Sequence, residues 1–138
     1  MSHEIEKIKT HFNDVKDTEN LNTAEGTCFW AGEEFKVQVA KGTATLNTNG
    51  TNHFRVQKNN ILTISSINGK KMVSITLEST TEKYATALKE MFESEGYTVS
   101  VNGLEVTINV DSLDTVSITT TKLSRIASVK VVYEKSAE

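Results

Sequence analysis

Apolar and polar residues alternate in the central part of the chain. Val73, Ile75 and Leu77 recur at every second position, with Ser74 and Thr76 between them. Because successive side chains of a strand point to opposite faces of a sheet, this pattern predicts a strand with one buried and one solvated face. The stretch 68–110 begins with this strand, and the rest of the chain is organised around it.

A helical period replaces the alternation directly after this strand. Apolar residues gather on one helical face: Tyr84, Leu88, Met91 and Phe92. Ser79, Thr80 and Thr81 offer hydroxyl groups for an N-cap, with Glu82 as a capping-box partner of Ser79. Gly96 follows the apolar helical pattern and can adopt the left-handed conformation that commonly ends a helix. The pattern predicts an amphipathic helix near 82–95 that lies against the sheet.

A hairpin is expected after this helix. Alternating apolar residues occur on both sides of a turn: Tyr97, Val99, Val101, Leu104, Val106, Ile108 and Val110. Asn102 and Gly103 lie between the two runs and form the pair preferred in a type I′ turn.

Further short alternating runs are found at 35–39, 54–56, 61–67, 116–118 and 127–133. Closely spaced strands joined by tight turns favour an antiparallel β-sandwich over a parallel sheet. We therefore expect a mainly β, jelly-roll-like fold with about nine short strands. The sandwich domain is assigned to 35–134, and 135–138 to a frayed polar tail.

The N-terminal segment shows a different pattern. Ile5, Ile8, Phe12 and Val15 follow a 3-4-3 spacing, which predicts a short helix with a narrow apolar side. We assign 1–17 to a helical arm and 18–34 to a connecting loop and first turn. A helix this short is marginal in water, so it would dock on its own domain or on a neighbouring subunit.

Charge and cysteine content narrow the function classes. The chain carries 15 basic and 18 acidic residues, a net charge of -3, and its basic residues are scattered along the sequence. This pattern argues against nucleic acid as a partner. Cys28 is the only cysteine, which excludes an intramolecular disulfide and a cysteine-based zinc site. No apolar run reaches the length of a membrane span, and no signal peptide is visible, so we expect a soluble protein made in the cytoplasm.

Motifs of catalysis are absent from the sequence. His3, His11 and His53 do not form an HExxH pattern, and GxSxG, P-loop and GxGxxG motifs are missing. Asp111 and Asp114 lack the spacing of a calcium loop. We expect a non-enzyme with no catalytic residue, cofactor or metal.

Aromatic and amide side chains allow a second interpretation. Phe29 and Trp30 stand between two glycines, and an aromatic ring in a turn can stack on a sugar. Trp30, with Asn47, Asn49 and Asn52 as hydrogen-bonding groups, is the candidate glycan site. The alternative is that the aromatic pair closes one end of the sandwich.

Four segments in order resemble a module of Bacteroidetes surface and secreted proteins: HFRVQKNNILTIS, NGKKMVSITLE, the helix with the hairpin YTVSVNGLEVTINVDS, and VSITTTKLSRIASVKVVYE. The resemblance covers 35–134 and includes Arg125 and Ile126 before the closing strand. It implies a jelly-roll-like accessory module without a catalytic motif. The chain departs from this pattern by standing alone and by carrying the N-terminal arm.

The resemblance and these departures imply a bacteriophage of such hosts. The expected function is a virion-associated protein, either a capsid decoration or an auxiliary component. It would assemble with a protein partner or as a homo-oligomer, through its sheet edges and through Ile5, Ile8, Phe12 and Val15. The alternative is a carbohydrate-binding or adhesion module of a gut bacterium.

Overall fold

The computed structural model describes residues 5–11, 27–31, 35–43, 53–67 and 69–134, with β1 and β2 described by their backbone pairing. All pairs of neighbouring strands in this part of the chain are antiparallel. Helix α2 stands between two of these strands in the sequence. The prediction of a mainly β, antiparallel sandwich with a helix near 82–95 is confirmed.

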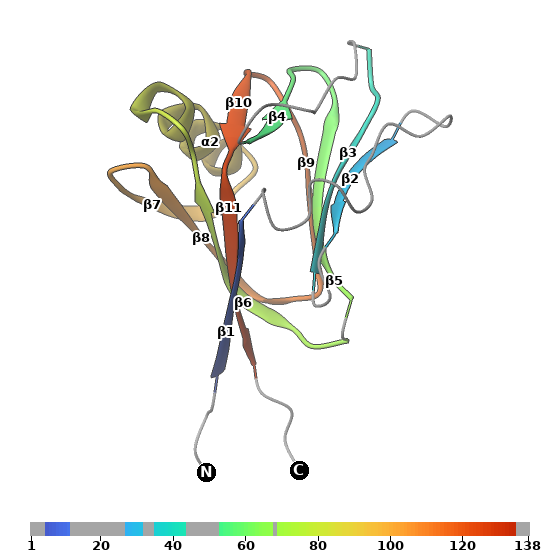
Figure 1. Cartoon of the computed structure of the whole chain (residues 1–138), viewed down its shortest axis with the longest axis vertical. Helices are drawn as coiled ribbons and strands as arrows, with labels where there is room; N and C mark the ends of the chain where they lie inside the picture. The colour runs from blue at the N-terminus through green and yellow to red at the C-terminus, as the bar shows by residue number, and fades with distance from the viewer. Residues whose placement is uncertain (1–4, 12–26, 32–34, 44–52, 68, 135–138) are drawn as a thin grey trace.

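Two larger sheets face each other, and a short two-stranded sheet lies at one end (Figure 1). The first sheet contains, in spatial order, β1 (Ile5–His11), β11 (Ser128–Glu134), β6 (Met72–Glu78), β8 (Glu105–Leu113) and β7 (Thr98–Asn102). The second contains β2 (Thr27–Ala31), β3 (Phe35–Ala40), β5 (Ile61–Ser66) and β9 (Thr115–Thr119). The short sheet pairs β10 (Ser124–Ile126) with β4 (Phe54–Val56).

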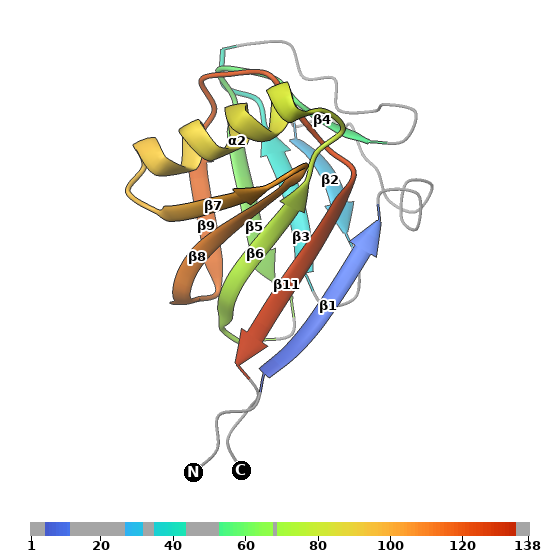
Figure 2. The ribbon, with the colours of Figure 1, turned by 90° about the vertical axis from the view of Figure 1, so that its left-hand side faces the viewer.

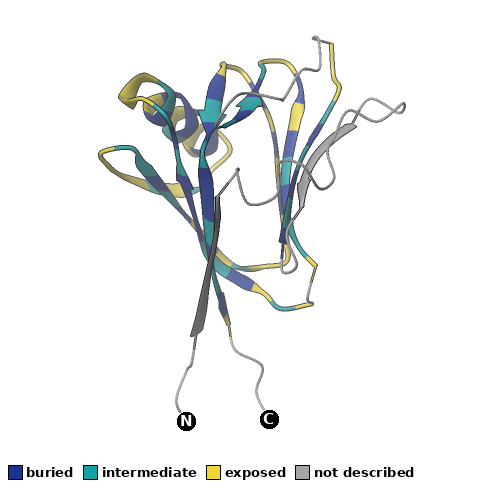
Figure 3. Cartoon of the chain, in the orientation of Figure 1, coloured by how far each residue is buried: buried dark blue, intermediate teal, exposed yellow. Residues whose placement is uncertain are grey.

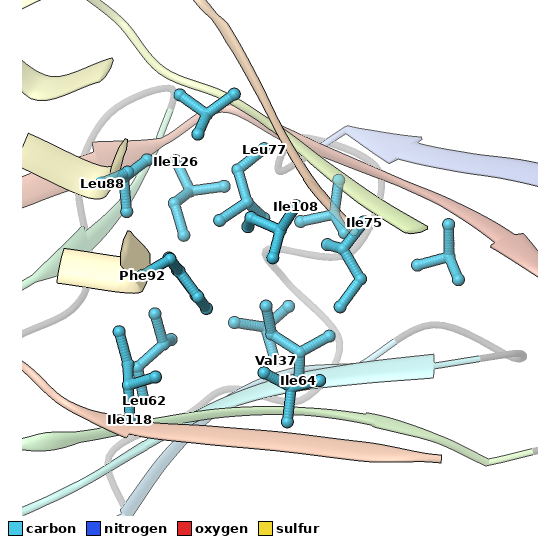
Figure 4. Packing of buried hydrophobic residues seen from close by; sticks show 14 of the residues in the cluster. Val37, Leu62, Ile64, Ile75, Leu77, Leu88, Phe92, Ile108, Ile118 and Ile126 are labelled. Atoms are coloured by element: carbon cyan, nitrogen blue, oxygen red, sulfur yellow. The ribbon is translucent and has the colours of Figure 1, made fainter. Parts of the chain in front are cut away.

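The core lies between the two larger sheets. Buried residues, dark blue in Figure 3, recur along the described strands of both larger sheets. Figure 4 shows Ile75 and Ile108 on one layer opposite Val37 and Ile64 on the other. Fully burying an aliphatic side chain of this size contributes about 1.5–3 kcal/mol, so the interleaved layers are the main source of stability.

Helix α2 (Glu82–Ser94) covers one end of this core. Leu88 and Phe92 point from the helix into the space between the layers (Figure 4). Thr81 is the N-cap, and its hydroxyl accepts a hydrogen bond from the Tyr84 N–H. Ser79 donates instead to the Arg125 carbonyl at 2.7 Å, so the suggested capping box with Glu82 is wrong. Gly96 has a φ of 98°, which confirms the expected terminator.

Strand β6 departs from the strict alternation that its sequence shows. Met72, Ile75 and Leu77 are fully buried, whereas Val73 is only half-buried. The pairing of β6 with β8 shifts register between Met72 and Ser74. A bulge there moves the side-chain alternation by one position, so Met72 takes the core position that we predicted for Val73.

The hairpin of β7 and β8 forms as expected, but its turn is displaced by one residue. Asn102 pairs with Glu105, which leaves Gly103 and Leu104 as the two turn residues. Gly103 has a φ of 64°, and neither Asn102 nor Leu104 is among the residues with positive φ. This is the φ pattern of a type II′ turn with glycine in first position, and the predicted type I′ turn at Asn102 and Gly103 is wrong.

The N-terminal segment is a strand where we predicted a helix. β1 (Ile5–His11) pairs with β11 along its whole length, from Ile5 opposite Glu134 to His11 opposite Ser128. A 3-4-3 spacing gives a single apolar side only in a helix, so the strand conformation removes the basis of the predicted helical arm. The 3-4-3 spacing fits a helix, but pairing with an unoccupied sheet edge outweighs the weak propensity of an isolated helix. Phe12 and Val15 lie outside the described residues.

The segment 18–34 also holds a strand that we did not predict. Phe29 and Trp30 belong to β2, which pairs with β3, and Trp30 is opposite Val37. The turn-like context that we inferred from the flanking glycines is therefore wrong for this pair. Strand pairing satisfies the backbone groups of both neighbours, and aromatic residues suit a pleated surface.

Candidate binding surface beside helix α2

An open groove of about 800 Å³ lies between α2, the turn after β4 and the segment 121–123. Its lining combines hydroxyl, amide, ammonium and apolar groups: Gln57, Lys58, Lys83, Tyr84, Thr86, Ala87, Glu90, Thr121, Lys122 and Leu123. The Lys122 Nζ lies 3.2 Å from Glu90 Oε1, and both side chains are about half exposed. Groups of this mixture can hold a polar ligand by hydrogen bonds while the ring and methyl groups contact its apolar parts.

Tyr84 stands in the first turn of α2, and cations lie near its ring. The Arg125 guanidinium carbon is 5.1 Å from the ring centroid, and the Lys83 Nζ is 5.9 Å from it. Both distances fall within the range of a cation–π interaction. Ser124 donates a hydrogen bond to the Tyr84 carbonyl at 2.8 Å, which fixes the start of α2 on β10. Tyr84 therefore joins the groove to the outer face of the short sheet.

Two arginines stand directly opposite each other on that outer face. Arg55 of β4 and Arg125 of β10 are register partners, and both are half-buried between fully buried neighbours. Directly opposite residues of an antiparallel pair have Cβ atoms roughly 4.5–5.5 Å apart, and like charges in this position are destabilising. The Nε atoms of Arg55 and Arg125 are buried and have no hydrogen-bond partner.

His53 lies beside this arginine pair. It directly precedes β4, two residues before Arg55, and both residues are half-buried. Its Nε2 atom is buried without a hydrogen-bond partner. Burial lowers the pKa of His53 below its usual value of 6.5, and the positive charges of Arg125 and Arg55 lower it further.

Positive charge is concentrated in this region. The groove holds three lysines and one glutamate, and Arg55 and Arg125 adjoin it. Five cations thus stand against one acid, whereas the whole chain carries 15 basic and 18 acidic residues. These residues come from three separate parts of the sequence, 55–58, 83–90 and 122–125, so the inference from their scattered positions missed this surface. We define Arg55, Arg125 and His53 as the arginine face.

Buried polar residues near this surface tie strands together. Asn60 is fully buried and accepts a hydrogen bond from the Gly42 N–H at 2.9 Å. Its own N–H donates to the Thr120 hydroxyl, and that hydroxyl donates to the Gln57 carbonyl at 2.7 Å. Asn59 has a φ of 66°, which confirms the predicted turn at Asn59 and Asn60. This network fixes the turn that carries Lys58 into the groove.

The predicted site residues do not gather in this region. Trp30 lies in β2, in the second sheet, and Ile5 and Ile8 lie in β1, at the edge of the first. The remaining predicted residues, Phe12, Val15, Asn47, Asn49 and Asn52, lie outside the described residues. The groove and the arginine face were therefore found from the structure and not from the sequence.

Comparison with protein-family models, curated proteins and solved structures finds no match to this chain. Among the described residues, no helix has the length and apolar character needed to cross a membrane. The same part of the chain contains no group of three or more His, Cys, Asp or Glu residues that could hold a metal ion. Asp111 and Asp114 thus form no such group with their described neighbours.

Proposed function

We propose that this chain is a non-catalytic binding and structural protein that acts through contacts made by its surface. The groove beside α2 carries this proposal, because its hydroxyl, amide and ammonium groups lie around Tyr84 in one open cavity. Buried serine side chains support the non-catalytic part of the proposal, because their hydroxyl groups are engaged within the fold. Those of Ser79, Ser124 and Ser128 are hydrogen-bonded to neighbouring elements and so hold the fold together.

The biological setting that we propose is a bacteriophage particle, in which the chain is a decoration or auxiliary component. The sequence resemblance over 35–134 supports this setting. The uncharged edge strand β9, with the sequence TVSIT, supports assembly through sheet edges, because such edges are commonly protected by charged residues or proline. The partner would be a second copy of the chain or another protein of the particle.

Filling the groove tests the binding role. Thr86 is an exposed residue of α2 that lines the groove, so Thr86→Trp would place an indole ring in the cavity without disturbing the core. We expect this variant to lose retention on purified particles by about tenfold, the effect of losing roughly 1.4 kcal/mol. Co-sedimentation followed by mass spectrometry measures the retained chain.

The matched control is Ser94→Trp, which adds the same ring to an exposed position of α2 outside the groove lining. It should be retained like the unmodified chain. Equal retention of both variants would place the contact elsewhere on the molecule. Absence of the chain from purified particles would contradict the virion setting and leave the groove to be tested with soluble ligands.

A glycan-binding role is the second candidate, and Tyr84 favours it. An aromatic ring beside hydroxyl and amide groups is a common arrangement for holding a sugar. A glycan array would show binding to the unmodified chain that Thr86→Trp reduces and Ser94→Trp leaves unchanged. Trp30, Asn47, Asn49 and Asn52 remain the sequence-based candidates for such a site, and Trp30→Ala tests them separately.

A further inference from the structure

The arginine face holds two neighbouring positive charges that its contacts with the described residues do not balance. Arg55 and Arg125 place two positive charges on directly opposite positions of a two-stranded sheet. No carboxylate of the described residues forms an ion pair with either one, whereas Lys89 pairs with Glu93 and Lys122 pairs with Glu90. The ten residues before His53 contain no Asp or Glu. The repulsion between the arginines is therefore not offset by a neighbouring acid in this part of the molecule.

Three buried nitrogen atoms of this face lack partners. They are the Nε atoms of Arg55 and Arg125 and the Nε2 atom of His53. A buried donor without a partner costs about 1–3 kcal/mol, and more when the group is charged. An acceptor with several oxygen atoms would satisfy these groups and neutralise the repulsion at the same time.

We propose that the arginine face binds one phosphate or sulfate ester group, carried on a ligand whose uncharged part occupies the groove. Guanidinium groups match such oxyanions because their N–H donors form a planar fork that can make two parallel hydrogen bonds. The ring of Tyr84 lines the groove and contacts the Arg125 guanidinium, so it connects the groove with the arginine face. His53 lies close enough to both arginines for their charges to act on its imidazole, and the chain as a whole carries a net charge of -3, which disfavours a long polyanion.

Binding of an oxyanion by the arginine face does not depend on the proposed function. Only the role of the groove in holding the uncharged part of the ligand rests on it. Calorimetric titration separates the two, with inorganic sulfate, inorganic phosphate, glucose 6-sulfate, glucose 6-phosphate and glucose at constant ionic strength. We expect the four anions to bind and glucose alone to show no measurable heat of binding. We expect the sugar esters to bind more tightly than the inorganic ions.

Arg55→Gln and Arg125→Gln should each weaken sulfate binding by about tenfold or more, because each removes a charge-assisted hydrogen bond. The matched control is Lys71→Gln, an exposed lysine before β6 whose carbonyl accepts a hydrogen bond from the Glu134 N–H. This end of β11 lies at the pole of the sandwich opposite β4 and β10 (Figure 1). The affinity of Lys71→Gln for sulfate should stay unchanged. Arg55→Gln should also unfold at the same or a higher urea concentration, since it relieves the repulsion, so lost binding would not reflect lost folding.

Other results of these titrations would overturn either the oxyanion site or the role of the groove. Absence of sulfate and phosphate binding, or equal losses in Lys71→Gln and the arginine variants, would overturn the site. Tight, salt-sensitive binding of an oligonucleotide without binding of the single groups would also overturn it, in favour of a nucleic-acid surface. Equal affinity for sulfate and glucose 6-sulfate, unchanged by Thr86→Trp, would keep the oxyanion site and contradict the role of the groove.

Discussion

At the scale of single residues, His53 of the arginine face makes the stability of the folded chain depend on pH. The pKa of His53 is lower than that of an ordinary histidine, because burial and the charges of Arg125 and Arg55 disfavour its protonated form. The unfolded chain, with a histidine pKa near 6.5, then binds more protons than the folded chain just below that pH. Stability therefore falls as the pH is lowered through 6.5 towards the depressed pKa of the folded state.

His53→Gln should remove this contribution. We expect the variant to gain stability relative to the unmodified chain as the pH is lowered from 8 to 5, with the titration of His53 contributing least to the difference at pH 8. Urea unfolding at both pH values measures the difference, and comparing the two proteins cancels the contributions of the other histidines. A difference that stays constant with pH would show that His53 titrates normally.

Residue types predicted the turn at Asn59 and Asn60, but they did not predict the long-range contacts of this turn. Asn59 and Asn60 indicated a turn because asparagine tolerates a positive φ, and the turn is present. The sequence did not show that Asn60 is fully buried, since its partners Gly42 and Thr120 are distant along the chain. A Cβ at Gly42 would collide with the Asn59 carbonyl oxygen, a constraint that also arises only in the fold.

At the scale of elements, the start of α2 offers a matched pair of hydroxyl groups. Thr81 caps the helix by accepting a hydrogen bond from the Tyr84 N–H, whereas the neighbouring Thr80 hydroxyl is buried without a partner. Thr81→Ala should cost about 1 kcal/mol of stability, the usual value for losing an N-cap. Thr80→Ala should be neutral or stabilising, because it removes an unsatisfied polar group.

Urea unfolding of both variants tests this pair, and the difference between them is the informative quantity. A larger loss for Thr80→Ala than for Thr81→Ala would mean that Thr80 provides the cap in solution. Since α2 also carries Tyr84 and Thr86, we expect weaker ligand binding in Thr81→Ala and unchanged binding in Thr80→Ala.

The elements with strong local signals were the ones that the sequence predicted well. Helix α2 combines an apolar face, capping hydroxyls and Gly96, and its position was correct to within one residue at its C-terminal end. The segment at 5–11 shows the limit of this approach, because its 3-4-3 spacing is a genuine helical pattern. Its strand conformation depends on β11, which lies more than a hundred residues further along the chain.

At the scale of the whole molecule, β1 protects the edge of the first sheet. Without it, the outer backbone groups of β11 would be unpaired and could pair with another chain. Removing residues 1–11 should therefore lower the urea midpoint and cause concentration-dependent association, measured by light scattering. Removing residues 1–4 alone leaves β1 in place and should change neither property.

This experiment also bears on the idea of an N-terminal docking arm. A change of oligomeric state on removal of residues 1–17 would not by itself show that the segment docks on a partner, because the same change uncovers β11. If the protein without residues 1–11 stays monomeric and equally stable, the pairing of β1 with β11 contributes little, and docking through this segment becomes the better explanation.

The core of the architecture was predictable because most of its strands show alternation in their own sequence, whereas β1 and β2 do not and were missed. The candidate binding surface was not predictable, because Arg55, Lys83 and Arg125 come together only through the pairing of β4 with β10 and the placement of α2. Nothing in the spacing of these residues marks them as neighbours. The same holds for the groove, whose lining combines residues from 57–58, 83–90 and 121–123.

Pairing of Ile5 with Glu134 brings the beginning of β1 and the end of β11 together at one pole of the sandwich. Strand β4 and helix α2 (Figure 2), together with β10 (Figure 1), occupy the other pole. The seven residues of β11 separate the poles by roughly 20 Å. A molecule immobilised on a sensor chip or a bead through a tag at either terminus would thus hold its cationic end outward. Both attachment choices should give the same access to a dissolved anion.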